Sequence, residues 1–428
     1  MLSDYEEQGK YVNLSLSSHL ADSLDASERD FLTALLYTSV EHKLTYDYYI
    51  GALSERSPDK IDTYTRNILR IGMCQIIDMD KIPDFAAVNE TVKLARNSGE
   101  RSFVNALLRS VIRNKDALPM PKRKKNAARY LSVRYSFPLW TVKKFIEWYG
   151  EEGAEALLSS YNKIQPTDLT VNTSKITRAH FIQKLIALGY KAEASLYSDI
   201  SLRIYGSVDP KELPGFECGE FFIQDAACAA AISKLSPQEN EALVDVCACP
   251  GGKSFAAAVL MNGKGHITSY DIHESKIPLI TNGAQRLGIS LISASVCDAT
   301  VGDKAKFYSA DRVICDVPCS GLGVLGKKPD LRYKSAESME SLPSIQLSIL
   351  KTSANYLKPG GRLLYSTCTL NPDENVGVVE KFLSETGGFH TVDFEVGGFK
   401  SQHGSFTFVP HIHNTDGFFM SLIEKDNY

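Results

Sequence analysis

Apolar residues in the first quarter of the chain recur every three to four positions, which is the spacing of one face of an α-helix. The pattern is clear in FLTALLYTSVEH, TYTRNILRIGMCQIID and FVNALLRSVIRN, and Pro and Asp mark the breaks between them. We therefore predict an all-helical domain over residues 1–118. Residues 119–163 are predicted to form a basic linker within LPMPKRKKNAARY, followed by helices in PLWTVKKFIEWYG and AEALLSSYN.

The apolar spacing changes near residue 164. LTVNT has a strand pattern, residues 177–188 have a helical pattern, and SLRIYG and GEFFIQD are further apolar runs of strand length. These elements predict a small α/β domain over residues 164–226, which we expect to be similar to an RNA-recognition motif.

Short apolar runs alternate with helical patterns in residues 227–428. The strand-like runs are ALVDVCA, HITSYDI, LISASVCD, DRVICDVP and GRLLYSTC. Strands that alternate with helices predict right-handed crossovers and a mostly parallel, Rossmann-like sheet. Two late runs, FHTVDFE and FFMSLIEK, have no long helix between them and are expected to pair antiparallel at one edge.

The composition limits the class of protein to which the chain can belong. The chain has 428 residues, 43% hydrophobic and 23% charged, and it contains no apolar run of the length that crosses a membrane. It starts with MLSDYEEQGK, which lacks the apolar centre of a signal peptide, so we expect a cytoplasmic protein with reduced thiols.

The net charge of −4 gives no overall signal for a nucleic-acid partner. Any RNA would have to bind local basic patches. The candidates for phosphate contact are Lys122, Arg123, Lys124, Lys125, Lys327, Lys328 and Arg332. The alternative for both groups is a solvated surface.

The segment DVCACPGGKS joins the first strand of the large sheet to its first helix, at the carboxyl end where such sheets bind ligands. It has neither the spacing of a phosphate-binding loop nor that of a dinucleotide loop. Asp271, about twenty residues later, ends the second strand, where a carboxylate binds ribose hydroxyls. Asp298 follows the third strand and is expected near the adenine. The pattern predicts an adenosine cofactor without pyrophosphate, and S-adenosylmethionine is the obvious candidate.

Two cysteines are expected at the same edge, because Cys319 follows the fourth strand and Cys368 ends the fifth. Most other cysteines are better interpreted as small apolar residues; these are Cys74, Cys218, Cys228 and Cys315. The spacings Cys247-x-Cys249 and Cys315-x3-Cys319 do not match the C-x2-C pairs of zinc sites, so we predict no metal.

A thiolate at this edge would have a clear chemical use. Its addition to C6 of a pyrimidine turns C5 into a carbon nucleophile that can accept a methyl group. Asp316 could bind the N3 and amine edge of cytosine, and a second thiol or another base would then remove the C5 proton. The residues alone do not say which cysteine attacks.

Four segments resemble, in order, the motifs of the NOL/NOP/Sun RNA (cytosine-5) methyltransferases; they are CACPGGK, DIHESK, DVPCSGLGVLGKKPDLR and YSTCTLNPDENVGVV. FVNALLRSVIRN and the helices before it resemble the antitermination factor NusB. A NusB-like domain fused to this catalytic module is the layout of a bacterial branch of the family that acts on ribosomal RNA.

The resemblance implies a class I methyltransferase domain that binds S-adenosylmethionine. It implies that Cys368 attacks and that Cys319 assists release, with Asp316 at the cytosine. The implied cofactor contacts are Cys247, Ala248, Cys249, Pro250, Gly251, Gly252, Lys253, Asp271, Asp298 and Asp316.

The resemblance also implies a target cytosine in 16S ribosomal RNA, in a single-stranded loop or flipped out of a stack, in free or partly assembled small-subunit RNA. We expect a monomer. The chain departs from the family pattern at Thr170, Cys249 and Arg332-Tyr333, where the family usually has Arg, Ala and Lys-Trp. The alternatives are the same chemistry on tRNA or 23S RNA, or a non-catalytic RNA-binding or antitermination module.

Overall fold

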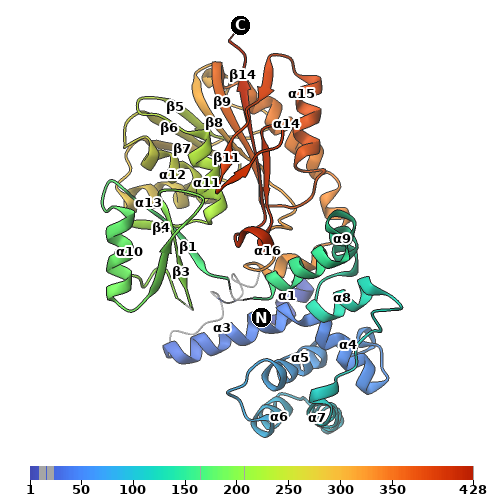
Figure 1. Ribbon diagram of the computed structural model, residues 1–428. Helices are drawn as coiled ribbons and strands as arrows, with labels where there is room; N and C mark the ends of the chain where they lie inside the picture. Colours follow the sequence, from blue (N-terminus) through green and yellow to red (C-terminus); the bar gives the residue numbers. More distant parts are fainter. Residues whose placement is uncertain (9–15, 17–23, 164, 207, 428) are drawn as a thin grey trace. The chain divides into compact units, whose positions relative to one another are not determined.

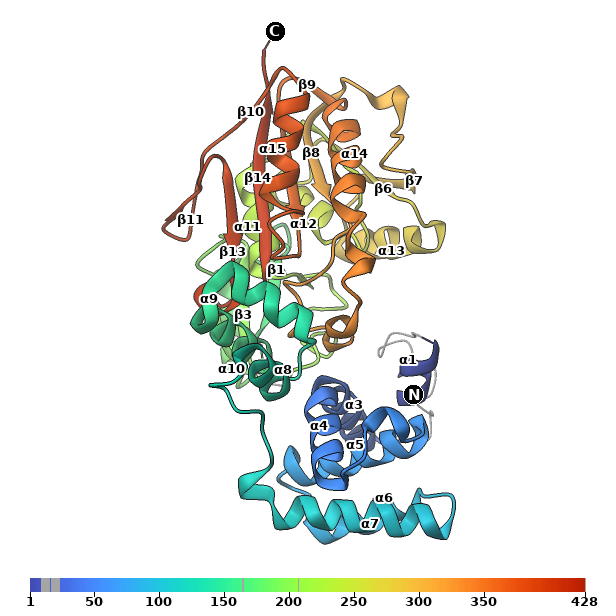
Figure 2. The same ribbon diagram turned by 90° about the vertical axis from the view of Figure 1, so that its right-hand side faces the viewer.

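The computed structural model describes residues 1–8, 16, 24–163, 165–206 and 208–427. The chain forms two compact units (Figures 1 and 2). The helical unit contains residues 1–163 and Leu325–Ala336, and the catalytic unit contains residues 164–324 and 337–428. The boundaries predicted at residues 118 and 226 fall inside these units.

The helical unit confirms the predicted all-helical domain. Its helices are α1 (Leu2–Gln8), α3 (Ala26–Glu41), α4 (Lys43–Ser54), α5 (Thr63–Ile77), α6 (Asp84–Lys93), α7 (Ser98–Arg113), α8 (Ala127–Tyr135) and α9 (Leu139–Tyr161). Polar side chains begin several of them, as where Asp62 accepts a hydrogen bond from the N–H of Thr65 at the start of α5. The core of α4 to α7 includes Leu69, Met73 and Leu108, all fully buried.

Leu325–Ala336 lies in the sequence between two parts of the second unit, but it folds as part of the helical unit. The sequence did not predict this. The Arg332 side chain is buried there, with Nη2 3.0 Å from Glu41 Oε1 and 3.3 Å from the Tyr161 carbonyl. Its guanidinium also lies over the Phe137 ring, 4.3 Å from the centroid. The structure therefore corrects the expectation that Arg332 contacts RNA, because a buried and paired guanidinium does not face a phosphate.

The small domain of the catalytic unit contains β1 (Thr167–Val171), α10 (Arg178–Ala187), β2 (Lys191–Ala194), β3 (Ser201–Tyr205) and β4 (Phe221–Ile223). The strands form an antiparallel sheet in the order β2-β3-β1-β4. Phe181 and Leu185 of α10 pack on this sheet in a buried core. The predicted α/β domain is confirmed, although β2 was missed because this short, mostly exposed edge strand (KAEA) has little apolar surface.

The large sheet contains β5 (Ala242–Asp245), β6 (His266–Asp271), β7 (Ile292–Val296), β8 (Ala310–Asp316), β9 (Leu357–Thr367), β10 (Phe389–Thr391), β13 (Ser405–Phe408) and β14 (Phe418–Lys425). The order is β10-β14-β9-β8-β5-β6-β7, and β13 also pairs with β14. Strands β5 to β9 are parallel, whereas β14 is antiparallel to β9 and β10. The predicted antiparallel pair at one edge is confirmed. A two-stranded hairpin, β11 (Glu395–Val396) and β12 (Phe399–Lys400), was not predicted.

Helices cover both faces of this sheet (Figure 1). One face packs against α11 (Ala226–Leu235), α12 (Gly252–Leu260) and α13 (Ile277–Leu287), and the other against α14 (Leu342–Ala354) and α15 (Val376–Glu385). The short helix α16 (Pro410–His413) precedes β14. In the part of the chain that the structure describes, no helix combines the length and apolarity needed to cross a bilayer.

A buried ion pair joins β1 and β3 of the small domain, and its carboxylate also contacts the start of α11. Asp168 and Arg203 are cross-strand partners in β1 and β3, and their side chains meet at 2.8 and 3.1 Å. Asp168 Oδ2 also accepts a hydrogen bond from the N–H of Ala226 at the start of α11, at 3.3 Å. Removing one member of such a pair leaves a buried, uncompensated charge.

We predict that Asp168→Ala lowers the free energy of opening of β1 and β3 by about 3–5 kcal/mol, because Arg203 loses its buried partner. Peptide-resolved hydrogen exchange would measure the change. Asp199→Ala is the control, since this exposed side chain lies 3.7 Å from Arg178 and should matter little. Equal protection of the small sheet in the two variants would contradict the prediction.

Candidate active site

The predicted cofactor loop lies between the end of β5 and the start of α12, at the carboxyl edge of the sheet. Gly251 has φ 111°, and an added Cβ would lie 2.4 Å from the Phe255 ring. A side chain is therefore excluded at Gly251 by both its backbone conformation and its neighbour. The N–H of Ala248 donates to the Tyr270 carbonyl at 2.7 Å, which holds the loop against β6.

Two predicted carboxylates lie beside this loop. Asp271 is buried at the end of β6, and its Oδ1 accepts a hydrogen bond from the N–H of His273 at 3.0 Å. Asp298 is exposed after β7, and its Oδ1 accepts hydrogen bonds from the N–H and Oγ1 of Thr300, which lower its pKa. The N–H of Cys297 donates to the Asp271 carbonyl at 3.1 Å, so the structure brings the two segments together.

The residues present fit an adenosine cofactor. Asp271 presents a carboxylate of the kind that accepts hydrogen bonds from ribose hydroxyls. The first N–H groups of α12, beginning at Gly252, have no acceptor within the helix and lie next to the loop. Residues 247–253 thus form a glycine-containing loop beside one buried carboxylate.

Sequence reasoning missed Asp245, the last residue of β5. Its side chain is fully buried, and burial raises its pKa to about 7. Asp245 Oδ2 accepts a hydrogen bond from Ser254 Oγ at 2.7 Å, and that hydroxyl also lies 2.8 Å from Ser269 Oγ. The signal in the sequence was an aspartate ending an apolar strand directly before the glycine-rich loop. This network fixes the start of α12 on the sheet.

Asp316, at the end of β8, is held by two neighbours. Its Oδ2 lies 2.7 Å from Lys253 Nζ, and its Oδ1 accepts a hydrogen bond from Ser366 Oγ at 2.7 Å. Burial alone would lower the pKa of Lys253, but the Asp316 carboxylate raises it above its ordinary value. Lys253 is therefore a cation that orients Asp316 and compensates its charge.

The two predicted catalytic cysteines are in contact. Cys319 Sγ and Cys368 Sγ are 3.2 Å apart, and both residues are half-buried. The hydrogen bond with Cys368, together with burial, raises the pKa of Cys319 well above the ordinary value of a thiol. The bond to Cys368 and burial thus disfavour the thiolate form of Cys319.

Close backbone contacts hold the two cysteine loops together. The N–H of Gly323 donates to the Cys368 carbonyl at 2.9 Å, and the N–H of Gly417 donates to the Gly323 carbonyl at 2.8 Å. A Cβ on Gly323 would lie 1.9 Å from the Gly417 carbonyl oxygen, so only glycine fits there. Ser320 Oγ and Thr369 Oγ1, 2.6 Å apart, add a side-chain contact beside each cysteine.

The candidate RNA contacts lie in the helical unit. Its exposed members are Lys122, Arg123, Lys124, Lys125, Lys327 and Lys328. Arg123 forms ion pairs with Glu151 at 2.8 Å and Glu155 at 2.7 Å, so its charge is partly compensated. Lys327 and Lys328 belong to Leu325–Ala336 and therefore to the same unit as the other four.

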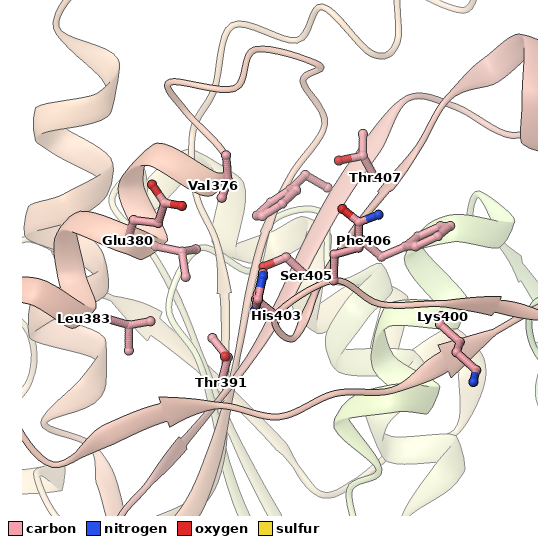
Figure 3. A pocket seen from close by; sticks show the side chains of 12 residues that line it. Val376, Glu380, Leu383, Thr391, Lys400, His403, Ser405, Phe406 and Thr407 are labelled. Carbon is pink, nitrogen blue, oxygen red and sulfur yellow. The ribbon is translucent and has the colours of Figure 1, made fainter.

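A cavity of about 590 Å³ opens on the α15 face of the large sheet (Figure 3). Val376, Glu380 and Leu383 of α15 form one side, and residues of β10, β12, β13 and β14, with Gln402 and His403, line the rest. Its lining includes none of the predicted catalytic or cofactor residues.

Family models match three parts of the chain. The model described as 16S rRNA methyltransferase RsmB/F matches residues 232–424, and the NusB family matches residues 1–113. The ferredoxin-like domain of RsmF/B-like methyltransferases matches residues 137–210.

Similar proteins cover nearly the whole chain. The probable ribosomal RNA small subunit methyltransferase B of Bacillus subtilis is 34% identical, with 98% of this chain and 96% of the relative aligned. The crystal structure of PH0851 matches with a TM-score of 0.81 and 27% identity over 96% of this chain and 93% of its own. NSun6 from Pyrococcus horikoshii with SFG, an S-adenosylmethionine analogue, has the same fold over 68% of this chain and 99% of its own, at a TM-score of 0.62 and 21% identity.

We predict that limited iodoacetamide at about pH 8 labels Cys368 before Cys319, because only the thiolate reacts and the raised pKa of Cys319 disfavours its thiolate. Peptide mass spectrometry would give both rates. In Cys368→Ser the hydrogen bond that most raises the pKa of Cys319 is weakened, so Cys319 should label faster. The exposed Cys218 is an internal control whose rate should not change. Equal labelling of the two rim cysteines in the unsubstituted protein would contradict this prediction.

Proposed function

We propose a reaction for this chain from the premise that it belongs to the family of ribosomal RNA small subunit methyltransferases B. It is accordingly an S-adenosylmethionine-dependent methyltransferase of 16S ribosomal RNA. We infer that the methyl group is transferred to C5 of a cytosine through a covalent bond between Cys368 and C6. The observation that carries this inference is the pair of sulfurs 3.2 Å apart at the carboxyl edge of the sheet, beside the cofactor loop.

The cofactor is assigned to the loop of residues 247–253 and to Asp271 and Asp298. When bound, S-adenosylmethionine supplies an electrophilic methyl group. The loop backbone and the Asp271 carboxylate bind and orient it, while Gly251 keeps the loop in its conformation. Asp316 lies between this loop and the cysteines, since Lys253 of the loop forms its ion pair.

The first step is attack by the Cys368 thiolate on C6 of the cytosine. The new C–S bond uses the electron pair of the thiolate, and the electrons of the C5–C6 double bond move toward C5 and N3. Asp316, held by Lys253 and Ser366, is placed to bind the N3 and amine edge of the base and so to stabilise the adduct. C5 then accepts the methyl group.

Release requires loss of the C5 proton and of the C6–S bond. A base takes the proton, the C–H electrons restore the C5–C6 double bond, and Cys368 leaves as a thiolate. Cys319 is the nearest candidate for this base, once its own proton has passed to solvent.

RNA binding is assigned to Lys122, Lys124, Lys125, Lys327 and Lys328, with Arg123 as a paired member of the group. C6 is out of reach inside a stack, so the target is proposed to be a single-stranded or flipped cytosine in free or partly assembled small-subunit RNA. A monomer acting in the cytoplasm is consistent with this substrate. The contact between the two rim thiols favours an enzyme over a non-catalytic RNA-binding module.

We predict that the protein methylates one loop cytosine of 16S RNA taken from cells that lack its gene. Labelled S-adenosylmethionine would report incorporation, and bisulfite sequencing would locate the 5-methylcytosine. Parallel reactions with 23S RNA and tRNA are the controls. Incorporation into tRNA alone, or into a base other than cytosine, would contradict the proposal.

We predict that Cys368→Ala abolishes methylation, because the nucleophile is lost, whereas Cys319→Ala accumulates a covalent protein–RNA adduct. Incorporation assays and a denaturing gel with labelled RNA would measure the two effects. Cys218→Ala, an exposed cysteine away from the rim, is the control. Near-normal methylation by Cys368→Ala would refute the assigned nucleophile, and the absence of any adduct in Cys319→Ala would refute the release role.

A further inference from the structure

Glu374 lies between the two cysteine loops, and its side chain is completely buried. Its Oε2 accepts hydrogen bonds from the Ser320 N–H and from Gln346 Nε2, both at 2.9 Å. Its Oε1 accepts a hydrogen bond from Asn371 Nδ2 at 3.0 Å. Ser320 directly follows Cys319, so this carboxylate joins the loop after β8 to the loop after β9.

Gln346 extends the same connection to the other side of Cys319. Its Nε2 also donates to the carbonyl of Pro318, at 2.9 Å. The two chain neighbours of Cys319 are therefore both held through Glu374 and Gln346. On the other loop, the Tyr365 hydroxyl donates to the Glu374 carbonyl at 2.6 Å, which fixes Glu374 on the strand that ends next to Cys368.

The surroundings of Glu374 suit a negative charge. All three groups that face the carboxylate are N–H donors, and an ionised carboxylate is the form that only accepts hydrogen bonds. Among the described residues, no lysine or arginine forms an ion pair with it. Its charge thus acts on nearby groups without a compensating cation, and Cys319 is the nearest group that can lose a proton on the loop it holds.

We propose that Glu374 is a positioning residue for the thiol pair: it holds the loop of Cys319 on the loop of Cys368 and keeps the shared proton on Cys319, so that Cys368 attacks. The proposal rests on the proposed function, since it explains how the nucleophile is selected. Glu374 acts through its hydrogen bonds with Ser320 and Gln346 and through its charge.

The other charges around Cys319 are consistent with this role. The pKa of Cys319 is raised first by its hydrogen bond with Cys368, then by burial, and then by the charges of Glu374 and Asp316. Asp316 comes from β8 and is paired with Lys253 of α12, and Tyr365 comes from β9. Glu374 is the unpaired charge of this group.

Glu374→Gln tests the charge while keeping the shape. The amide oxygen of the new side chain can still accept from Ser320 and Gln346, and Asn371 can turn its own amide oxygen toward the new NH₂ group. We expect the ratio of Cys368 to Cys319 labelling by iodoacetamide to fall about tenfold, because a like charge near Cys319 is lost. The labelling profile of Cys319 should also move to lower pH. Neither change is expected from a purely structural defect.

Glu374→Ala removes the hydrogen bonds as well. We expect kcat for methylation to fall about 100-fold, because loss of the connection misplaces the two sulfurs. The KM for RNA should stay within about twofold, since a completely buried side chain makes no RNA contact. Glu380→Ala is the matched control, because Glu380 is an exposed acid of α15 and should change neither quantity. Thermal unfolding and S-adenosylmethionine binding would be measured for every variant.

An unchanged labelling ratio in a folded, cofactor-binding Glu374→Gln protein would overturn the proposal. Loss of activity accompanied only by unfolding, with no shift in the Cys319 profile in the Gln variant, would also overturn it. The labelling ratio does not depend on methyl transfer. A shifted ratio in a protein that forms no 5-methylcytosine would therefore refute the proposed function and leave the thiol-pair role supported.

Discussion

The parallel pairing of β8 with β9 is the constraint on which the candidate site depends. Its register places Asp316, the last residue of β8, opposite Ser366, one residue before the end of β9. Parallel strands finish at the same edge of a sheet, so the loops that follow must leave side by side. Cys319 and Cys368 meet for this reason, although they are 49 positions apart in the chain.

Polar groups inside the protein fix this arrangement more tightly than apolar packing would. Asp245, Lys253, Asp316 and Glu374 all lie within or beside the large sheet, and each has specific hydrogen-bond partners. A buried polar group without a hydrogen-bond partner raises the free energy of the folded state. Each of these groups therefore restricts its neighbours to the few positions at which the hydrogen bonds form. The loops therefore hold their reacting atoms in place through directional bonds, which non-directional apolar contacts cannot do.

The chain that follows Cys319 leads directly into a segment of the helical unit. Only the residues Ser320 to Val324 separate this cysteine from Leu325–Ala336, whose Arg332 and Tyr333 are bound inside the helical unit. A buried guanidinium with a carboxylate, a carbonyl and an aromatic ring as partners is a strong anchor. The loop of Cys319 is thereby covalently continuous with a segment that folds as part of the other unit.

The sequence by itself determined much of this protein. Apolar periodicity predicted the helices, the small α/β domain and the parallel strands, because these patterns report which face of each element is buried. The positions of Asp271, Asp298, Cys319 and Cys368 at strand ends predicted one shared edge. The four motifs predicted the family and the cofactor.

The tertiary structure alone decided three further points, all of which depend on contacts between distant residues. It placed Arg332 in the interior, where the sequence suggested an exposed RNA contact, because Glu41 and Tyr161 lie far away in the chain. It showed Asp245 and Glu374 as buried acceptors, since a single carboxylate in a sequence looks the same whether solvent or N–H donors surround it. It also set the two sulfurs in contact, which raises the pKa of Cys319. Local patterns specify which surfaces are buried, whereas hydrogen-bond partners and charge neighbours are specified only when the chain has folded.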